Sequence, residues 1–360
     1  MWHFVLLIAC AGAIYFACEW FVNAVEWLGR RLDVGHLAVG SVLAAVGTAL
    51  PESVVTLVAV TTGGASGQGI GVGAAMGGPL VLATVAYGVT GAALFLRRRR
   101  VLVPAHQGAA SSGDSGGPGS EDGRGAGVLA GAGAVRRLMG DQRWFLGVFL
   151  VKVALGLVAF AVKPWLGLVF FAAYGVYFWR EMRAGDGGHD AAHEGEGGGL
   201  AALKIQPRRA EPATWAVVVQ TLAALAVIFV ASQAFVAQLD AIGPMIGLPA
   251  AVTALLLSPI ATELPEIMNA VIWVRQGKTT LALANISGAM MIQATVPSGL
   301  GLLFTPWRFD ATLLWSGLAT MIAIGYLLAT ARTGRLTPAR LAAAGLGYAV
   351  FAAGLWFTLT

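Results

Sequence analysis

The chain has 360 residues, of which 57% are hydrophobic and 11% are charged, and its mean hydropathy is +0.75. A single soluble core cannot bury this much apolar surface, so the composition excludes an ordinary soluble protein and indicates a chain that crosses a lipid bilayer. The formal net charge of +5 does not indicate a nucleic-acid partner, because basic residues in a membrane protein first of all mark its orientation.

Ten stretches of the sequence are long and apolar enough for membrane-spanning helices, which need about 20 mostly apolar residues each. The first has no Lys or Arg ahead of it and is too long for the apolar core of a signal peptide, so we expect it to be retained. The sequence therefore predicts an all-α membrane protein with ten transmembrane helices. The ten stretches are 3–28, 35–61, 69–96, 144–162, 164–180, 213–238, 248–274, 279–304, 311–331 and 339–359.

Two segments rich in glycine and small residues separate groups of these helices. We expect residues 104–143 and 181–212 to be flexible cytoplasmic linkers. They divide the chain into a first half at 1–103, a helix pair at 144–180 and a second half at 213–360.

The second linker contains the run GDGGHDAAHEGEGGG, in which His189 and His193 stand four residues apart among acidic residues. These groups either form a weak site for a divalent metal or belong to a solvated loop. The glycines on both sides favour the loop, because they do not support a stable helix. The acidic neighbours are Asp190, Glu194 and Glu196.

The basic residues are distributed asymmetrically between the two sides of the predicted bundle. The loops after the first, third, fifth, seventh and ninth helices carry 20 of the 23 Lys and Arg, and the opposite loops carry only Lys163 and Arg308. Lys152 lies within a helix, and we expect its long side chain to reach the headgroups on the basic side. The bias predicts cytoplasmic basic loops and outside termini in a multi-pass protein of the plasma (inner) membrane.

The chain contains an internal repeat. A shift of 214 positions lays Pro51 and Glu52 on Pro265 and Glu266 and also aligns the preceding helices. Each half then holds five helices, and an odd number forces the second copy to enter the membrane upside down. This architecture of inverted repeats is found in many secondary transporters. The aligned pairs in the preceding helices are Ala17/Ala231, Phe21/Phe235, Val22/Val236, Glu26/Asp240 and Gly29/Gly243.

Each repeat places a Pro-Glu pair inside the hydrocarbon, in the sequences GTALPES (47–53) and ATELPEI (261–267). A charge at this depth costs at least about 2.5–3.5 kcal/mol. Each proline also deprives the carbonyls near Gly47–Ala49 and Ala261–Glu263 of a helical donor.

Two glutamates, two threonine hydroxyls (Thr48 and Thr262) and several carbonyls make an all-oxygen shell that suits a hard cation such as Ca²⁺. The alternative is that the prolines only kink their helices and the glutamates face interhelical partners.

With these motifs the sequence resembles the cation/calcium exchanger superfamily, whose sodium/calcium exchangers carry a Gly-Thr-Ser-Leu-Pro-Glu type motif in each of two inverted alpha repeats. The matching residues are 47–52 and 261–266. The resemblance implies a sodium/calcium exchanger-like fold with two inverted five-helix repeats. It also implies ion sites in a diamond around Glu52 and Glu266, with the first and sixth helices sliding to alternate access.

The sequence departs from the family pattern where the family has sodium-ligating groups. In the second repeat, residues 284–293 match the second half of the family motif and end in Gln293, which offers a carbonyl oxygen but no charge. In the first repeat, residues 73–82 match it and have lost its polar side chains. The serine after the motif threonine is Ala49 in one copy and Glu263 in the other, and Glu263 either lines the pathway or turns away from it.

The first helix carries Glu19, Asn23 and Glu26 on one face. If this helix slides as it does in the family, that face lines the cytoplasmic exit of the ion pathway. Alternatively, Glu26 lies at the headgroups and Glu19 pairs with a neighbouring helix.

These observations predict a secondary antiporter that exchanges Ca²⁺ or a related cation for Na⁺ or H⁺. Carboxylates crowded together take up protons more readily, which favours proton coupling. The alternatives are a cation/proton exchanger without Ca²⁺ specificity, a transport-inactive relative and a passive channel. An enzyme is not expected, because the helices contain no His-Glu-x-x-His motif. We expect no cofactor, no nucleic acid and no protein partner, only the bilayer and the transported cations. The expected cation ligands are Glu52, Glu266, Thr48, Thr262, Glu263 and Gln293.

Overall fold

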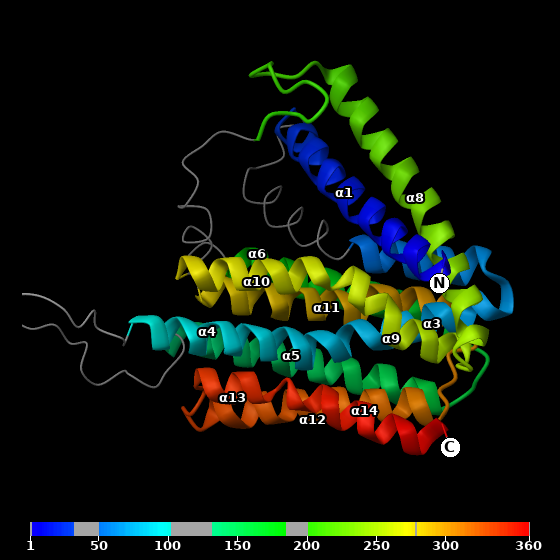
Figure 1. Cartoon of the computed structure of the whole chain (residues 1–360), viewed down its shortest axis with the longest axis vertical. Helices are drawn as coiled ribbons and strands as arrows, with labels where there is room; N and C mark the ends of the chain where they lie inside the picture. The colour runs from blue at the N-terminus through cyan, green and yellow to red at the C-terminus, as the bar shows by residue number, and fades with distance from the viewer. Residues whose placement is uncertain (1, 32–49, 102–131, 185–200, 278, 360) are drawn as a thin grey trace, which may run out of the picture.

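The structure of the chain, a computed structural model, describes residues 2–31, 50–101, 132–184, 201–277 and 279–359, and these residues form helices and connecting turns with no strand. In chain order the helices are α1 (Trp2–Arg31), an unlabelled helix (Leu50–Thr62), α3 (Gly64–Val81), the π-helix η1 (Leu82–Ala86), α4 (Tyr87–Val101), α5 (Ala132–Leu157), the 3-10 helix η2 (Lys163–Trp165), α6 (Leu166–Ala184), α8 (Thr214–Met245), α9 (Ala250–Thr262), α10 (Leu264–Gln276), α11 (Thr279–Phe304), α12 (Ala311–Arg332), α13 (Pro338–Ala343) and α14 (Leu346–Leu359) (Figure 1).

Every one of the ten expected membrane segments contains helix in the described residues. Seven helical spans there are long and apolar enough to cross a bilayer by themselves. The other three expected segments are the helix Leu50–Thr62, of which only the later part is described, and α5 and α6.

Apart from α6, which directly follows the short 3-10 helix η2, three of the ten segments are built from consecutive helical pieces, and in two of these three a proline lies at or close to the junction. Pro79 lies shortly before the π-helix η1, which separates α3 from α4, and Pro265 follows the junction between α9 and α10. A proline lacks the N–H that would continue the helical ladder, so each break follows from the local sequence. The third segment is divided between α13 and α14.

Helices α3 and α11 pack against each other at the centre of the main bundle, and the contacts around them repeat across the two halves. Helix α6 packs on α11 as α13 packs on α4, and α5 packs on α11 as α12 packs on α3. The pairs α1–α8 and α5–α12 join equivalent helices of the two halves. This pairing confirms the fold predicted from the sequence, with two inverted repeats of five helices.

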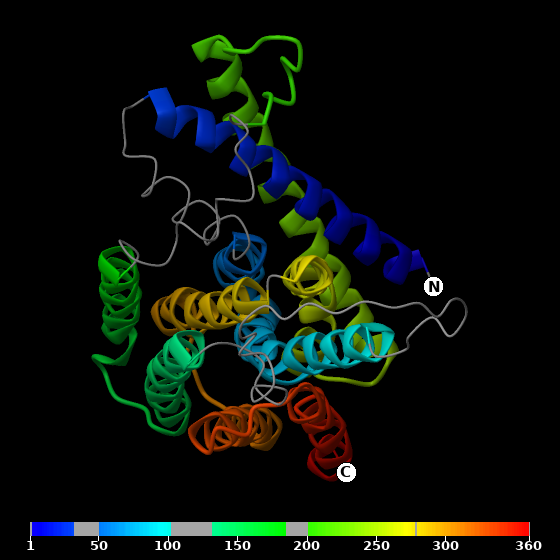
Figure 2. The ribbon, with the colours of Figure 1, turned by 90° about the vertical axis from the view of Figure 1, so that its left-hand side faces the viewer.

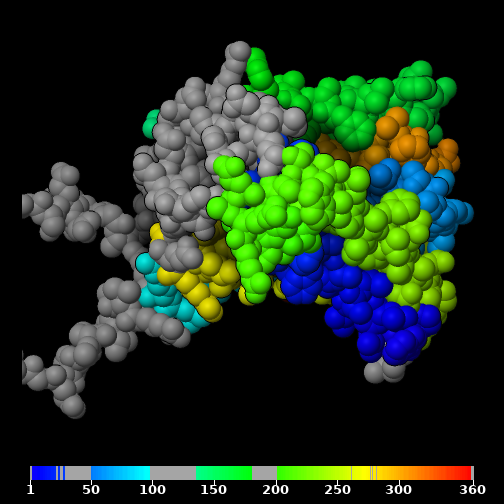
Figure 3. All heavy atoms as spheres, turned by 90° about the horizontal axis from the view of Figure 1, so that it is seen from above, coloured from blue at the N-terminus to red at the C-terminus, as the bar shows by residue number. Residues whose placement is uncertain are grey.

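Helices α1 and α8 form a pair that leans away from the remaining bundle (Figures 1 and 2). Seen from above, they lie across the top of the molecule (Figure 3). Both helices expose large apolar side chains, such as Phe16 and Phe229, as expected of lipid-facing helices. Beneath them an apolar cluster joins the pair to the helix Leu50–Thr62, α3 and α9.

Hydrogen bonds tie α1 to α8 near both ends. At one end, His3 Nδ1 lies 2.8 Å from Gln238 Oε1. At the other end, Gln220 Nε2 donates to Asn23 Oδ1 at 3.1 Å and to the Trp20 carbonyl at 2.8 Å. The two helices are therefore connected as one unit.

The short segment that precedes α8 packs against α1. Asn23 Nδ2 and Trp27 Nε1 donate to the Ala201 carbonyl at 3.2 and 2.9 Å, and Leu203 is buried between the helices. Glu19 forms an ion pair with Lys204 at 3.3 Å. Glu19 is therefore paired, as the second interpretation of the polar face of α1 expected, but with the segment that precedes α8 and not with a neighbouring helix. The side chain of Glu26 lies outside the described residues.

The expected linkers are shorter than their composition suggested. Helix α5 begins at residue 132 and α6 continues to residue 184, so 132–143 and 181–184 are helical. Residues 201–212 are folded against α1, because Leu203 supplies an apolar anchor. The histidine-rich run at 185–200 and the rest of the first linker lie outside the described residues.

Both ends of the chain lie at the same side of the bundle (Figure 1), as an even number of membrane crossings requires. The end of α4, with Arg97, and the turn between α12 and α13, with Arg332 and Arg335, lie at the opposite side. Lys163 and Arg308 line one hollow together. The alternation of basic loops is therefore reproduced, while which side faces the cytoplasm stays a prediction.

Candidate functional site

The second Pro-Glu motif forms the junction between α9 and α10. Pro265 has no N–H, so the Ala261 carbonyl lacks its usual helical donor. The backbone of Glu263 stays bonded on both sides, because its N–H donates to the Pro259 carbonyl at 2.9 Å and its carbonyl accepts from the Ile267 N–H at 3.1 Å. The expectation that the Glu263 carbonyl is free is therefore wrong, since Ile267, four residues on, still has an N–H. Gly47–Ala49 lie outside the described residues.

Three glutamates are buried together where the two repeats meet. Glu52, Glu263 and Glu266 are 1%, 0% and 0% exposed. Glu52 and Glu266 each interact electrostatically with Glu263 and with one another. The inverted repeats thus bring the glutamates of two distant Pro-Glu motifs close together, and their role as a cation site stays a prediction.

Glu263 points into this site and is held there by hydrogen bonds. Thr262 Oγ1 donates to Glu263 Oε1 at 2.9 Å, and Gln293 Nε2 donates to Glu263 Oε2 at 2.5 Å. Both carboxylate oxygens therefore accept a hydrogen bond from a neighbour, which suits an ionised carboxylate. Of the two positions considered for Glu263, the structure has the inward one.

The carboxylates of Glu52 and Glu266 are in a different state. None of their four oxygens accepts a hydrogen bond within 3.5 Å from the described part of the chain, although the Thr262 side chain lies near enough to Glu52 to interact with its carboxylate. Buried charged groups are normally paired or coordinate a cation, because an unpaired charge in a medium of low dielectric is costly. These four oxygens are therefore available to an ion.

Helix α3 approaches this site through a glycine. A Cβ atom on Gly78 would lie 2.6 Å from Gln293 Oε1 and 3.2 Å from Glu263 Oε1. Only a residue without a side chain lets α3 lie this close to the two groups. The loss of polar side chains in 73–82, noted in the sequence, thus has a steric reason at Gly78.

Several buried hydroxyls that the sequence analysis did not single out have no hydrogen-bond partner among the described residues. Thr56 lies one helical turn after Glu52, and Ser258 lies one turn before Thr262. That spacing of four is the signal from which they could have been found. The hydroxyls of Ser232 in α8 and Ser298 in α11 are also buried without a hydrogen-bond partner among the described residues. The sequence offers no comparable signal for these two. Thr48, an expected ligand, is outside the described residues.

The oxygens near the glutamates suit a hard cation but do not form a compact cage. In the part of the chain that the structure describes, no three carboxylate, imidazole or thiol groups lie close enough to hold a metal ion together. A cation at this site would therefore be held by two carboxylates supplemented by hydroxyl and carbonyl oxygens, which is a donor set that Ca²⁺ accepts.

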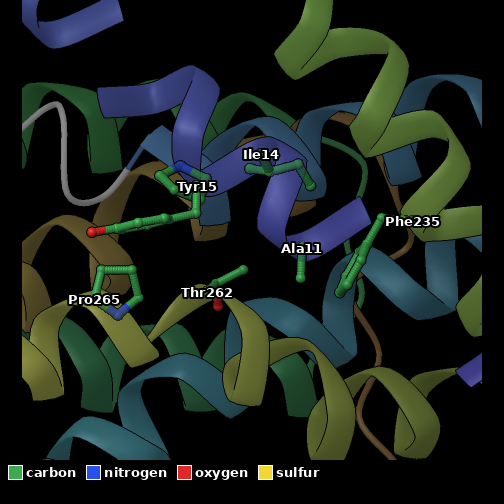
Figure 4. A pocket seen from close by; sticks show the side chains of 7 residues that line it. Ala11, Ile14, Tyr15, Phe235, Thr262 and Pro265 are labelled. Carbon is green, nitrogen blue, oxygen red and sulfur yellow. The ribbon is translucent and has the colours of Figure 1, made fainter. Parts of the chain in front are cut away.

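A small hollow lies between the α1–α8 pair and both motif prolines (Figure 4). Tyr15 of α1 extends toward Pro265, and Thr262 lies at the base of the hollow. The hollow therefore lies between the α1–α8 pair and Thr262, the residue that donates to Glu263. Its lining residues are Ala11, Ile14, Tyr15, Pro51, Phe235, Thr262 and Pro265.

Comparison with known proteins identifies the fold independently. A family model described as sodium/calcium exchanger protein matches residues 2–182 and 216–357. None of the curated proteins matches the chain.

Solved structures of similar fold cover nearly the whole chain. The crystal structure of the H⁺/Ca²⁺ exchanger CAX has a TM-score of 0.64 and 16% identity over 99% of this chain and 86% of that one. Native YfkE has a TM-score of 0.62 and 13% identity over 98% and 89%. The sodium-calcium exchanger NCX_Mj, soaked with 10 mM Na⁺ and zero Ca²⁺, has a TM-score of 0.54 and 16% identity over 98% of both chains. At these identities the likeness concerns the fold.

Proposed function

The chain belongs to the sodium/calcium exchanger protein family, whose proteins are membrane ion exchangers and not enzymes, and from this premise we propose that it is a secondary antiporter of Ca²⁺ or a related divalent cation. In this proposal the cation is exchanged for Na⁺ or H⁺ at a site built on Glu52 and Glu266. The protein lies in the plasma (inner) membrane with its basic loops in the cytoplasm.

One observation carries the proposal. Two inverted repeats each bury a glutamate whose oxygens accept no hydrogen bond within 3.5 Å from the described residues. Such a pair is stable in a membrane only if positive charge arrives from solution. A divalent cation, two monovalent cations or two protons all supply the required charge, and alternation between them is exchange.

The remaining polar groups of the site support a preference for hard cations. Thr262 lies beside Glu263, and the hydroxyls of Ser258 and Thr56 are buried without partners among the described residues. Hydroxyl, carbonyl and carboxylate oxygens together satisfy the 6–8 ligands of Ca²⁺. In this assignment Gln293 orients Glu263 through its amide N–H and offers its free Oε1.

Alternation between the two sides of the membrane is assigned to the α1–α8 pair. The two helices are bonded to each other near both ends, and they contact the site helices through an apolar cluster. Apolar contacts are not directional, so a sliding motion breaks few specific bonds. The hollow lined by Tyr15 and Phe235 lies where such a motion opens the site.

The test is flux measured in liposomes that contain the purified protein. Vesicles loaded with ⁴⁵Ca²⁺ receive an Na⁺ gradient or a pH gradient in separate experiments. An antiporter moves the tracer against its own gradient with one or both, whereas a channel only equalises it and a transport-inactive relative does neither. We expect Glu52→Gln and Glu266→Gln to abolish gradient-driven flux.

Glu19→Gln is the matched control, because Glu19 is a half-exposed glutamate of α1 that pairs with Lys204 outside the site. It should retain flux. Normal flux in both site variants would refute the role of the glutamates. Uphill flux with the pH gradient alone would identify H⁺ as the counter-ion.

A further inference from the structure

Lys152 is buried in the middle of the bundle. The expectation that its side chain reaches the headgroups on the basic side is wrong, because α5 begins at residue 132 and Lys152 lies near its other end, at Leu157. The side chain is 0% exposed. A lysine is rarely buried without a specific role or partner, so its surroundings need an explanation.

The ammonium of Lys152 is bound to a carbonyl that a proline has freed. Lys152 Nζ donates to the Ala75 carbonyl at 2.6 Å. The residue four positions after Ala75 is Pro79, which has no N–H to offer that carbonyl. Lys152 therefore binds a carbonyl that Pro79 leaves without a helical donor inside the continuous helix α3, as Pro265 leaves the Ala261 carbonyl without one at the α9–α10 junction.

The other neighbours of Lys152 are also those of a cation. Its Nζ lies 5.0 Å from the centre of the Phe149 ring, which is a cation–π distance. Lys152 also interacts electrostatically with Glu52. An aromatic face and a carbonyl therefore contact the ammonium, and the charge of Glu52 acts on it from beyond ion-pair distance.

Lys152 is close to the glutamate site along α3. Ala75 precedes Gly78 by three residues, which corresponds to about 4.5 Å along a helix. Gly78 is the residue that lies against Gln293 and Glu263. The lysine therefore faces the repeat in which the sequence has lost its polar side chains, at the level of the carboxylates.

We propose that Lys152 is a tethered cation that permanently fills one cation position of the exchange site, so that the transported ions have two negative charges to neutralise instead of three. This inference rests on the exchange function proposed above. With Glu52, Glu263 and Glu266 ionised and Lys152 charged, the net charge of the site is −2. One Ca²⁺ or two monovalent cations balance that charge, so exchange by the unaltered protein is electroneutral.

Removal of the tethered charge changes the number of ions in each cycle. In Lys152→Met the site charge becomes −3, so three monovalent cations are needed in one half of the cycle. If one Ca²⁺ travels in the other half, each cycle moves one net charge. The Ca²⁺ ratio reached across the membrane then changes about tenfold for each 59 mV of imposed potential.

The experiment measures flux in proteoliposomes at potentials set by K⁺ and valinomycin. We expect unaltered protein and Lys152→Arg to be insensitive to potential, and Lys152→Met to become sensitive. Lys163→Met is the matched control. Lys163 is also buried and donates to carbonyls, those of Val158 and Trp307 at 2.6 and 2.8 Å, but it lies in the turn between α5 and α6.

A binding measurement in detergent separates this inference from the proposed function. Because a positive charge next to the site is removed, Lys152→Met should bind Ca²⁺ at least tenfold more tightly than the unaltered protein, whether or not transport is detected. Lys163→Met should bind unchanged. If Lys152 only caps the Ala75 carbonyl, the Met variant binds equally or more weakly and its flux stays insensitive to potential, which overturns the inference. Flux by the unaltered protein that depends on potential overturns it without any variant, even if Lys152→Met does not fold.

Discussion

Replacement of Gly78 by alanine tests whether α3 must approach the carboxylate site closely. The new Cβ would lie 2.6 Å from Gln293 Oε1 and 3.1 Å from Gln293 Cδ. The Gln293 side chain then has to move, and its 2.5 Å hydrogen bond to Glu263 is lost or distorted. We therefore expect both the stability of the protein and the transport of cations to fall.

The magnitude follows from three effects. Insertion of a methyl group into a packed interior costs about 1–3 kcal/mol. Loss of a hydrogen bond to a charged group costs about 1.5–3 kcal/mol. Alanine recovers roughly 1 kcal/mol relative to glycine in a helix. The net loss in the free energy of unfolding is therefore about 1.5–5 kcal/mol.

The assay is thermal unfolding in detergent, followed by tryptophan fluorescence and compared with Gly325→Ala. Gly325 also lies inside a helix, but a Cβ there meets nothing within 4 Å. The control should be as stable as the unaltered protein or slightly more so. In the double variant Gly78→Ala/Gln293→Ala we expect a smaller loss than the sum of the single losses, because both changes act on the same contact. If Gly78→Ala is as stable and active as Gly325→Ala, the close approach of α3 has no importance for the site.

Three further predictions concern separate parts of the molecule. Ser258→Ala should leave the free energy of unfolding within about 0.5 kcal/mol of that of the unaltered protein, because the buried hydroxyl has no hydrogen-bond partner among the described residues. The same variant should bind Ca²⁺ several-fold more weakly in a titration with purified protein, and unchanged affinity would exclude this hydroxyl as a ligand. Asn23→Ala should lower the free energy of unfolding by about 1–3 kcal/mol, since the amide bridges Ala201 and Gln220, and a wild-type melting temperature would contradict that role. Asp310→Ala removes the N-cap of α12, whose carboxylate accepts from the Leu313 N–H at 2.8 Å, and should cost about 1 kcal/mol without altering the ion dependence of flux, which is measured in the same liposomes.

Local sequence signals were sufficient for the parts of the site that carry a distinctive pattern. A proline next to a glutamate inside an apolar stretch is unusual, and its recurrence at Glu52 and Glu266 predicted that the two halves meet. The inverted arrangement followed from the odd number of helices in each half. The structure agrees on both points because helix length and burial of charge are set by the bilayer.

Other features depend on contacts between distant segments and could not be read from the chain. Lys152 was misplaced because the apolar stretch begins at residue 144, whereas α5 begins at residue 132 and turns the lysine toward α3. Residues 201–212 look like linker by composition, but Leu203 finds a buried position against α1. The inward position of Glu263 depends on Gln293, which lies thirty residues further on. In each case a tertiary partner decides the outcome.

The double attachment of α1 to α8, through His3 at one end and Asn23 at the other, has a consequence for leakage. If α1 and α8 moved independently, both ends of the ion pathway could be open at once, and ions would then flow down their gradients without exchange. When the two helices move as one rigid unit, the movement that opens one end of the pathway closes the other. For the exchange proposed above, the hydrogen bonds between these helices therefore prevent both ends of the pathway from opening together, which keeps the membrane sealed throughout the cycle.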